Sequence, residues 1–259
     1  MLPNSLRFRG VHFAYLFGPP RFVPREEASR VHGKVCDALG YDDLTFRYGT
    51  GEQQAGKQSR GFQIEFQRPE GRGTFEVNID NPDVSQPIRL VMGWVWPPSL
   101  EHAKQALDLT AETVLESLQG EWTLVVAEAR LRAQCEARSE SAIGYIATEL
   151  LAVGPTWLEQ LGKPLTHASL KLEVGSSGTN DSLANPKRDL TIEVLRDDPK
   201  GLYLELVSQW SQFPPVASID LSNIRKIDKK PSEYVEDSIK YLRGRINGLA
   251  QLDGAQDAS

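Results

Sequence analysis

Residues Gly51 to Lys57 come nearest to a catalytic motif, because they match the first part of a phosphate-binding P-loop. In that motif a Ser or Thr follows the lysine and holds Mg²⁺, whereas this chain has Gln58. The motif also needs a helix directly after it, so that backbone N–H groups meet the phosphates. Residues 61–67 instead alternate apolar and polar side chains, as a strand does. We therefore predict a hairpin loop here and no nucleotide hydrolysis.

Other residue types that carry chemistry are scattered along the chain. The two cysteines, Cys36 and Cys135, offer no disulfide framework, and the four histidines include no metal-binding pair one helical turn apart. Glu65 and Glu193 occupy matching places in a repeat described below, so they could meet as an acid–base pair. Two solvated glutamates on an exposed sheet face are the favoured interpretation. We predict no catalytic residue, no metal site and no cofactor.

A segment of the chain is repeated, and this repeat indicates the architecture. Residues 60–92 align without a gap on residues 188–220, at a constant offset of 128. Identical residues in the two copies include Arg60 and Arg188, Ile64 and Ile192, and Glu65 and Glu193. The alignment pairs Phe75 with Tyr203, although Leu202, Leu204 and Leu206 carry the apolar alternation of the second copy. A bulge or a one-residue slip would reconcile the two patterns.

Hydrophobic periodicity predicts the same order of elements on each side of the middle of the chain. The first half reads as strand 6–17, helix 24–39, strands 44–48, 62–66, 75–79 and 88–96, and a helix capped by Ser99. The second half reads as strand 121–137, helix 139–151, strands 170–174, 189–195, 202–209 and 216–221, and a helix from about residue 231. Strands joined by short turns favour an antiparallel sheet with helices on one face.

The fold class predicted is therefore α+β, with tandem β-α-β(4)-α units that form one curved antiparallel sheet. The predicted halves are residues 1–119 and 120–252, followed by a flexible tail at 253–259. This order of elements resembles the fold of the TATA-box-binding protein, which implies a saddle-shaped sheet with helices on its convex side. The resemblance covers nearly the whole chain as architecture, without any sequence motif of that protein.

The length of 259 residues and the Leu2-Pro3-Asn4 opening are also similar to a scattered family of uncharacterised bacterial proteins. That resemblance implies an accessory gene associated with mobile elements or with antiviral defence. The start of the sequence has no signal-peptide pattern, and no apolar run reaches the roughly 18 residues of a membrane span. We expect a cytoplasmic protein that does not contact membranes. Its net charge of −6 argues against a general phosphate-binding surface.

The sheet face turned away from the helices is the predicted partner-binding surface. The candidate residues on it are Arg47, Gln63, Glu65, Asn78, Lys171, Glu193 and Glu205. The charges predicted for this face are mostly acidic, with glutamates at 65, 76, 173, 193 and 205 against Arg47 and Lys171. Such a face would repel a nucleic-acid backbone.

The sequence is compatible with three functions. The favoured one is a non-enzymatic interaction or accessory subunit that holds a protein partner, or a second copy, with its sheet face and paired loops. The second is nucleic-acid binding through the basic ends of the repeated loops, at Lys57, Arg60, Lys187 and Arg188. The third is a small-ligand or acid–base site in a pocket between helix and sheet.

Overall fold

The fold is described from a computed structural model of the chain. The described residues are 5–50, 61–82, 86–118, 122–137, 139–151, 167–174, 186–195, 197–211 and 229–256.

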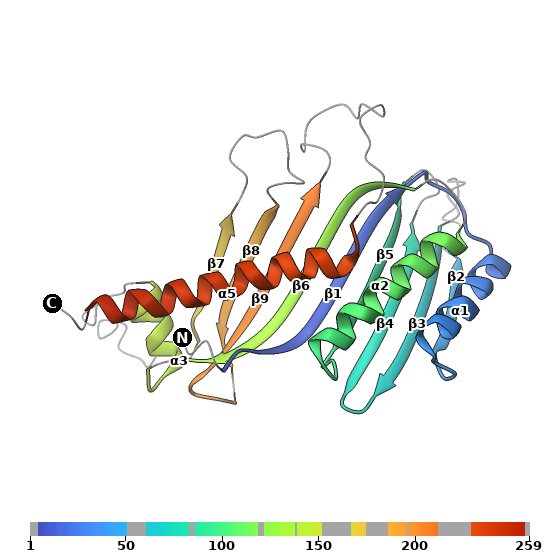
Figure 1. Ribbon diagram of the computed structural model, residues 1–259. Coiled ribbons are helices and arrows are strands. Elements are labelled where there is room, and N and C mark those ends of the chain that lie inside the picture. The colour runs from blue at the N-terminus through green and yellow to red at the C-terminus, as the bar shows by residue number, and fades with distance from the viewer. Residues whose placement is uncertain are drawn as a thin grey trace.

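The strands of the described residues form one nine-stranded antiparallel sheet that runs through both predicted halves (Figure 1). Its order is β2-β3-β4-β5-β1-β6-β9-β8-β7, so the long strands β1 and β6 lie side by side at the centre. The first half supplies β1 (Arg7–Gly18), β2 (Thr45–Thr50), β3 (Phe62–Glu70), β4 (Gly73–Asn81) and β5 (Ile88–Val95). The second half supplies β6 (Thr123–Glu136), β7 (Ser169–Val174), β8 (Lys187–Val194) and β9 (Gly201–Ser211).

Helices α1 (Arg25–Leu39), α2 (Leu100–Ser117) and α5 (Pro231–Gln256) lie over one face of this sheet (Figure 1). The predicted end of α1 and start of α2 are confirmed, whereas α5 extends to Gln256, into the segment predicted to be a flexible tail. Gly40 follows α1 in the left-handed conformation, at φ 66°, and the hydroxyl of Ser99 accepts a hydrogen bond from the backbone N–H of His102 at the start of α2. The helix expected over 139–151 is shorter than predicted, with α3 (Ala142–Gly144) followed by the π-helical turn η2 (Tyr145–Leu150).

Alternating strand residues on the helix side form the core. Phe13, Phe66, Phe75 and Trp94 are fully buried there, and the rings of Phe75 and Trp94 lie 5.3 Å apart. Since successive side chains of a strand point to opposite faces, the residues between them point to the side without helices. The two sets of predicted inward and outward residues in β3 and β4 are confirmed by this burial pattern.

The second hairpin corrects the prediction of a gapless repeat. Ile64 pairs with Ile79 between β3 and β4, but its counterpart Ile192 pairs with Leu204, three positions before Val207, the residue at offset 128 from Ile79. The connection between strands is longer here, spanning residues 195–200 instead of 71–72. Because the register of the second hairpin is shifted by an odd number of residues, the side chains of β9 exchange faces relative to those of β4. Tyr203 therefore points away from the core, although Phe75 points into it.

The two halves also differ in how they join the centre of the sheet. In the first half β5 lies between β4 and β1, whereas in the second half β6 pairs directly with β9. The strand predicted at 216–221 lies outside the described residues. Within the described part of the sheet, the strands common to the two ends are therefore a hairpin with its outer strand, β2-β3-β4 and β7-β8-β9.

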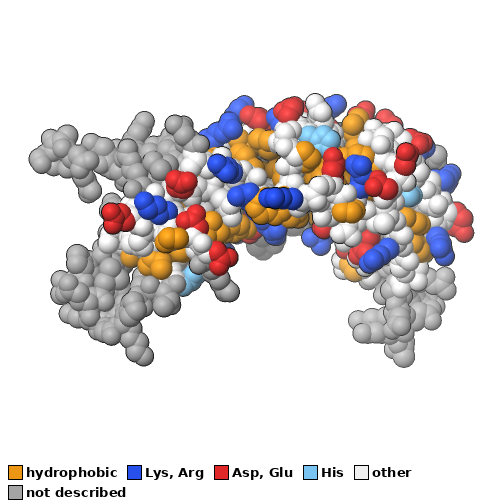
Figure 2. All heavy atoms as spheres, turned by 90° about the horizontal axis from the view of Figure 1, so that it is seen from below, with side chains coloured by type: hydrophobic (Ala, Val, Ile, Leu, Met, Phe, Trp, Pro, Cys, Tyr) orange, Lys and Arg blue, Asp and Glu red, His pale blue; other side chains and the backbone are white. Residues whose placement is uncertain are grey.

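The sheet is strongly bowed. Seen along the strands, the described atoms form an arch that is hollow on the side away from the helices (Figure 2). Among the described residues, helices cover the core on the convex side, and the hollow side of the sheet is free of helices.

Candidate functional site

We call the helix-free, hollow side of the sheet the open face. It carries side chains from every strand, and its charges are arranged in three zones. We call β2–β4 the first arm, β5, β1 and β6 the centre, and β7–β9 the second arm. The predicted residues Arg47, Gln63, Glu65 and Asn78 lie on the first arm, and Lys171, Glu193 and Glu205 lie on the second.

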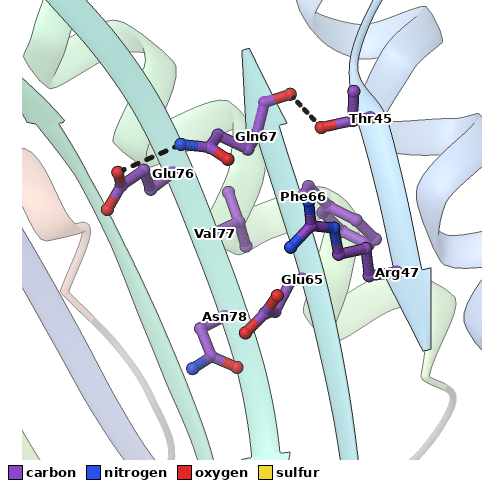
Figure 3. Close-up of a pocket in the computed structure, with 8 residues that line it drawn as sticks. All are labelled: Thr45, Arg47, Glu65, Phe66, Gln67, Glu76, Val77 and Asn78. Carbon is purple, nitrogen blue, oxygen red and sulfur yellow. Dashed lines mark hydrogen bonds between the residues drawn. The ribbon is translucent and has the colours of Figure 1, made fainter. Parts of the chain in front are cut away.

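A hollow of about 230 Å³ lies on the first arm and brings three predicted residues together (Figure 3). Arg47 of β2, Glu65 of β3 and Asn78 of β4 occupy directly opposed positions of the three strands. Glu65 lies between the other two in the close-up, while Gln67 donates a hydrogen bond to Glu76 at 3.5 Å on one side of them. Cross-strand register, set by the short turn at 71–72, thus assembles this site.

Several polar groups of this hollow have no partner among the described residues. The guanidinium of Arg47 makes no hydrogen bond or ion pair there, and the side-chain oxygen of Asn78 is buried without a donor. Glu65 accepts one hydrogen bond, from the amide of Gln63 at 2.8 Å. One carboxylate oxygen of nearby Asp80 is also buried without a partner, and burial raises the pKa of this group. The hollow therefore offers unused donors and acceptors side by side.

On the second arm Glu205 and Lys171 have polar partners, whereas Glu193 makes no hydrogen bond or ion pair among the described residues. Glu205 accepts hydrogen bonds from Arg132 at 2.9 Å and from the Tyr203 hydroxyl at 3.1 Å. Burial, together with the charge of Glu205, raises the pKa of Tyr203 to about 12, so this phenol stays protonated at neutral pH. Lys171 lies 3.2 Å from Glu173 across the exposed end of the same arm.

The centre of the open face holds charges that the prediction of an acidic face did not include. Arg89, Arg130 and Arg132 project from β5 and β6 around His12, and with Glu128 they line a second hollow of about 100 Å³. Burial, followed by the charges of Arg132 and Arg130, lowers the pKa of His12 to about 4. The open face is therefore acidic on its arms and basic at its centre. In the sequence, Ala127, Ala129 and Leu131 alternate with charged residues, and this alternation indicates that β6 presents charges on the face away from the core.

The basic loop ends predicted to bind nucleic acid do not form a cluster where they are described. Lys57 and Arg60 lie outside the described residues. Lys187 and Arg188 belong to strand β8, and adjacent strand residues face opposite sides. Lys187 lies 3.5 Å from Asp189, whereas Arg188 binds Asp237 of α5 at 2.6 Å on the helix side. Arg188 is thus used within the fold.

The acid–base pair of Glu65 and Glu193, which was the less favoured interpretation of the sequence, does not form. Glu65 is in β3 and Glu193 is in β8, and β4, β5, β1, β6 and β9 lie between them. Six strand spacings separate the two residues by roughly 29 Å along the sheet. The helix–sheet interface is filled by the buried aromatic and aliphatic core, and both hollows described above lie on the other side of the sheet.

Among the described residues, no three His, Cys, Asp or Glu side chains converge as a metal site would require. No helix in the described part of the chain has the length and apolar character needed to cross a bilayer. Comparison with protein-family models, with curated proteins and with solved structures found no match to this chain.

Proposed function

We propose that the protein is a non-enzymatic interaction module that holds a protein partner in the hollow open face of its sheet. The observation that carries this proposal is that the helix-free face is hollow and carries charged side chains with no hydrogen-bond or ion-pair partner among the described residues, Arg47, Arg89 and Glu193. Groups of opposite charge on a partner would pair with these side chains and fix its orientation.

The architecture proposed is a duplicated saddle that resembles the TATA-box-binding protein. It is supported by the strand–helix–four strands–helix order of the first half and by the adjacent central strands β1 and β6. It is further supported by the recurrence of a three-strand unit at each end of the sheet. In such a saddle the hollow side is the binding side, because helices close the other.

The charge pattern favours a protein over a nucleic-acid duplex. A duplex would bring phosphates against the arms, where Glu65, Glu76 and Asp189 lie on the open face. A folded protein can instead present an acidic centre between basic flanks, which is the complement of this surface. A second copy of the chain is one such candidate, and analytical ultracentrifugation of the purified protein tests it directly.

Affinity purification from the native host with matched charge variants tests the proposal. The variant Glu65→Lys/Glu193→Lys reverses two charges on the open face, and Glu112→Lys/Glu116→Lys reverses two exposed charges of α2. We expect the wild type and the α2 variant to retain one specific protein partner after nuclease treatment, and the open-face variant to lose it. Capture that is lost equally in both variants, or that consists of nuclease-sensitive nucleic acid, contradicts the proposal.

A further inference from the structure

Four arginines run along the centre of the open face, and we call them the arginine floor: Arg9, Arg89, Arg130 and Arg132. Arg132 lies opposite Gly10, Arg130 opposite His12 and Arg89 opposite Leu16. Leu16 lies six residue steps along β1 from Gly10, which corresponds to about 20 Å of extended chain. The arginine floor therefore follows the direction of the strands, along the length of the hollow.

Most hydrogen-bond donors of the arginine floor are free. A guanidinium has five N–H donors, and within the floor only two carboxylates engage them. Arg132 uses its Nε for Glu205, and Arg130 lies 3.4 Å from Glu128. Arg89 is exposed and makes no hydrogen bond or ion pair within the described residues. Arg9 donates to the amide oxygen of Gln134 at 2.6 Å and stacks on the ring of Trp96 at 3.9 Å.

The basic strip is narrow, because acidic residues border it on both arms. Asp80 and Glu76 of β4 lie on one side, and Glu205 and Asp189 of β9 and β8 lie on the other. The distance from β4 to β9 is four strand spacings, or roughly 19 Å. An anionic chain that follows the arginines along the strands stays clear of these acidic borders.

The surface between the arginines favours a peptide over a single nucleic-acid strand. Proteins that bind single strands without sequence preference combine a basic groove with aromatic side chains on which bases stack. Here the open-face side chains next to the arginines are mostly small or aliphatic, namely Ala14, Leu16 and Val91, while the ring of His12 is half-buried among the arginines and Arg9 stacks on the ring of Trp96. The donors match carboxylates, which arginine binds in pairs of parallel hydrogen bonds. The acidic borders match lysine or arginine side chains, which a nucleic acid lacks.

We propose that the arginine floor binds an acidic segment of a protein partner, with its Asp and Glu carboxylates spaced along the length of the hollow. This inference rests on the proposed function and names the chemistry of the partner. The segment runs parallel to β1 and β6, and its carboxylates take donors from Arg89, Arg130 and Arg132. Basic residues on either side of the segment face the two acidic borders.

Fluorescence anisotropy with the full chain tests this inference. The probes are a fluorescein-labelled peptide of alternating Glu and Ser, a matched Lys and Ser peptide, and oligo(dT), at a salt concentration of about 50 mM. The floor variant is Arg89→Gln/Arg130→Gln, and the control is Arg25→Gln/Arg30→Gln, which removes two exposed arginines of α1 and gives the same net charge. Thermal unfolding of both variants verifies that they are folded.

We expect the wild type and the control to bind the acidic peptide and the floor variant to bind it about tenfold more weakly. Arg130→Lys should keep part of the affinity, because it keeps the charge. Equal binding by the floor variant, no binding of the acidic peptide, or tighter binding of oligo(dT) overturns the inference. If the acidic peptide fails while Glu65→Lys/Glu193→Lys still abolishes capture of the partner, the proposed function stands without this inference. If both fail, both are wrong.

Discussion

At the centre of the sheet, neighbouring residue pairs of the same two strands meet opposite environments. Phe13 and Ala129 lie opposite each other under the helices and are buried, whereas the adjacent pair, His12 and Arg130, faces the hollow. The helix side has its aromatic rings in contact with one another, and the open side carries charged side chains, of which Arg47 and Arg89 have no hydrogen-bond or ion-pair partner among the described residues. One face of the sheet therefore stabilises the fold through its core, while the other carries the polar and charged side chains on which the proposed binding surface rests.

The largest effect expected from this comparison is on the helix side. Trp94 is fully buried between Phe75 and the ring of His102, so Trp94→Ala should cost about 3–5 kcal/mol in the free energy of unfolding. Val91 lies three residues before Trp94 in β5 and faces the open side, so Val91→Ala should cost less than about 1 kcal/mol in the free energy of unfolding. Urea unfolding measures both. Equal losses would contradict a core confined to the helix side.

Acid should weaken the fold through His12. Its pKa of about 4 lies below that of an unfolded histidine, so the unfolded state binds the proton first. The stability is therefore complete above about pH 6.5 and is lost as the pH falls toward 4, by up to about 3 kcal/mol. Unfolding curves across this range should show a smaller loss for His12→Gln than for the wild type. An NMR titration that places the His12 pKa near 6.5 would show that His12 does not cause the loss of stability in acid.

The close packing of Gly93 against His12 at the centre of the open face can be tested by substitution. A Cβ added to Gly93 would lie 2.3 Å from Nδ1 of His12 and 2.9 Å from the backbone oxygen of Val11. Gly93→Ala should therefore destabilise the fold by about 1–3 kcal/mol. Gly33→Ala in α1 meets no atom within 4 Å and should stabilise by up to about 1 kcal/mol, since Ala favours a helix. Thermal unfolding that ranks the two variants in the reverse order would show that His12 does not occupy this space.

The smallest effect on stability is expected for exposed charges of the open face. Glu65→Gln should change the free energy of unfolding by less than about 0.5 kcal/mol, because its hydrogen bond to Gln63 is exposed. The same change should weaken capture of the partner. A variant with reduced stability and unchanged capture would assign Glu65 to the fold and not to binding.

Much of the fold could be predicted from the sequence, because its signals are local. Alternation of Phe62, Ile64 and Phe66 fixed both the strand and the buried face, and Ser99 and Gly40 marked helix ends. The alternation of Leu202, Leu204 and Leu206 placed Tyr203 on the outward face, but the size of the register shift could not be predicted, because it depends on the length of the connection at 195–200. Hairpin register follows from such lengths and not from strand composition.

The candidate site was predicted at its edges and missed at its centre. Arg47, Glu65 and Asn78 lie on strands paired through local hairpins, so their shared face follows from alternation alone. The position of Arg130 beside His12 depends on the pairing of β1 with β6, which are far apart in the chain. No local pattern states which distant strands pair. The charge of the open face was therefore judged from its arms only.

A photoreactive amino acid placed on each side of the sheet tests the central claim most directly. Val91 lines the central hollow of the open face, and Leu109 is exposed on the outer side of α2. Irradiation in cells of the native host should give one discrete cross-linked protein from position 91 and none from position 109. The same cross-linked protein from position 109, with none from position 91, would contradict the assignment of the hollow face as the binding surface.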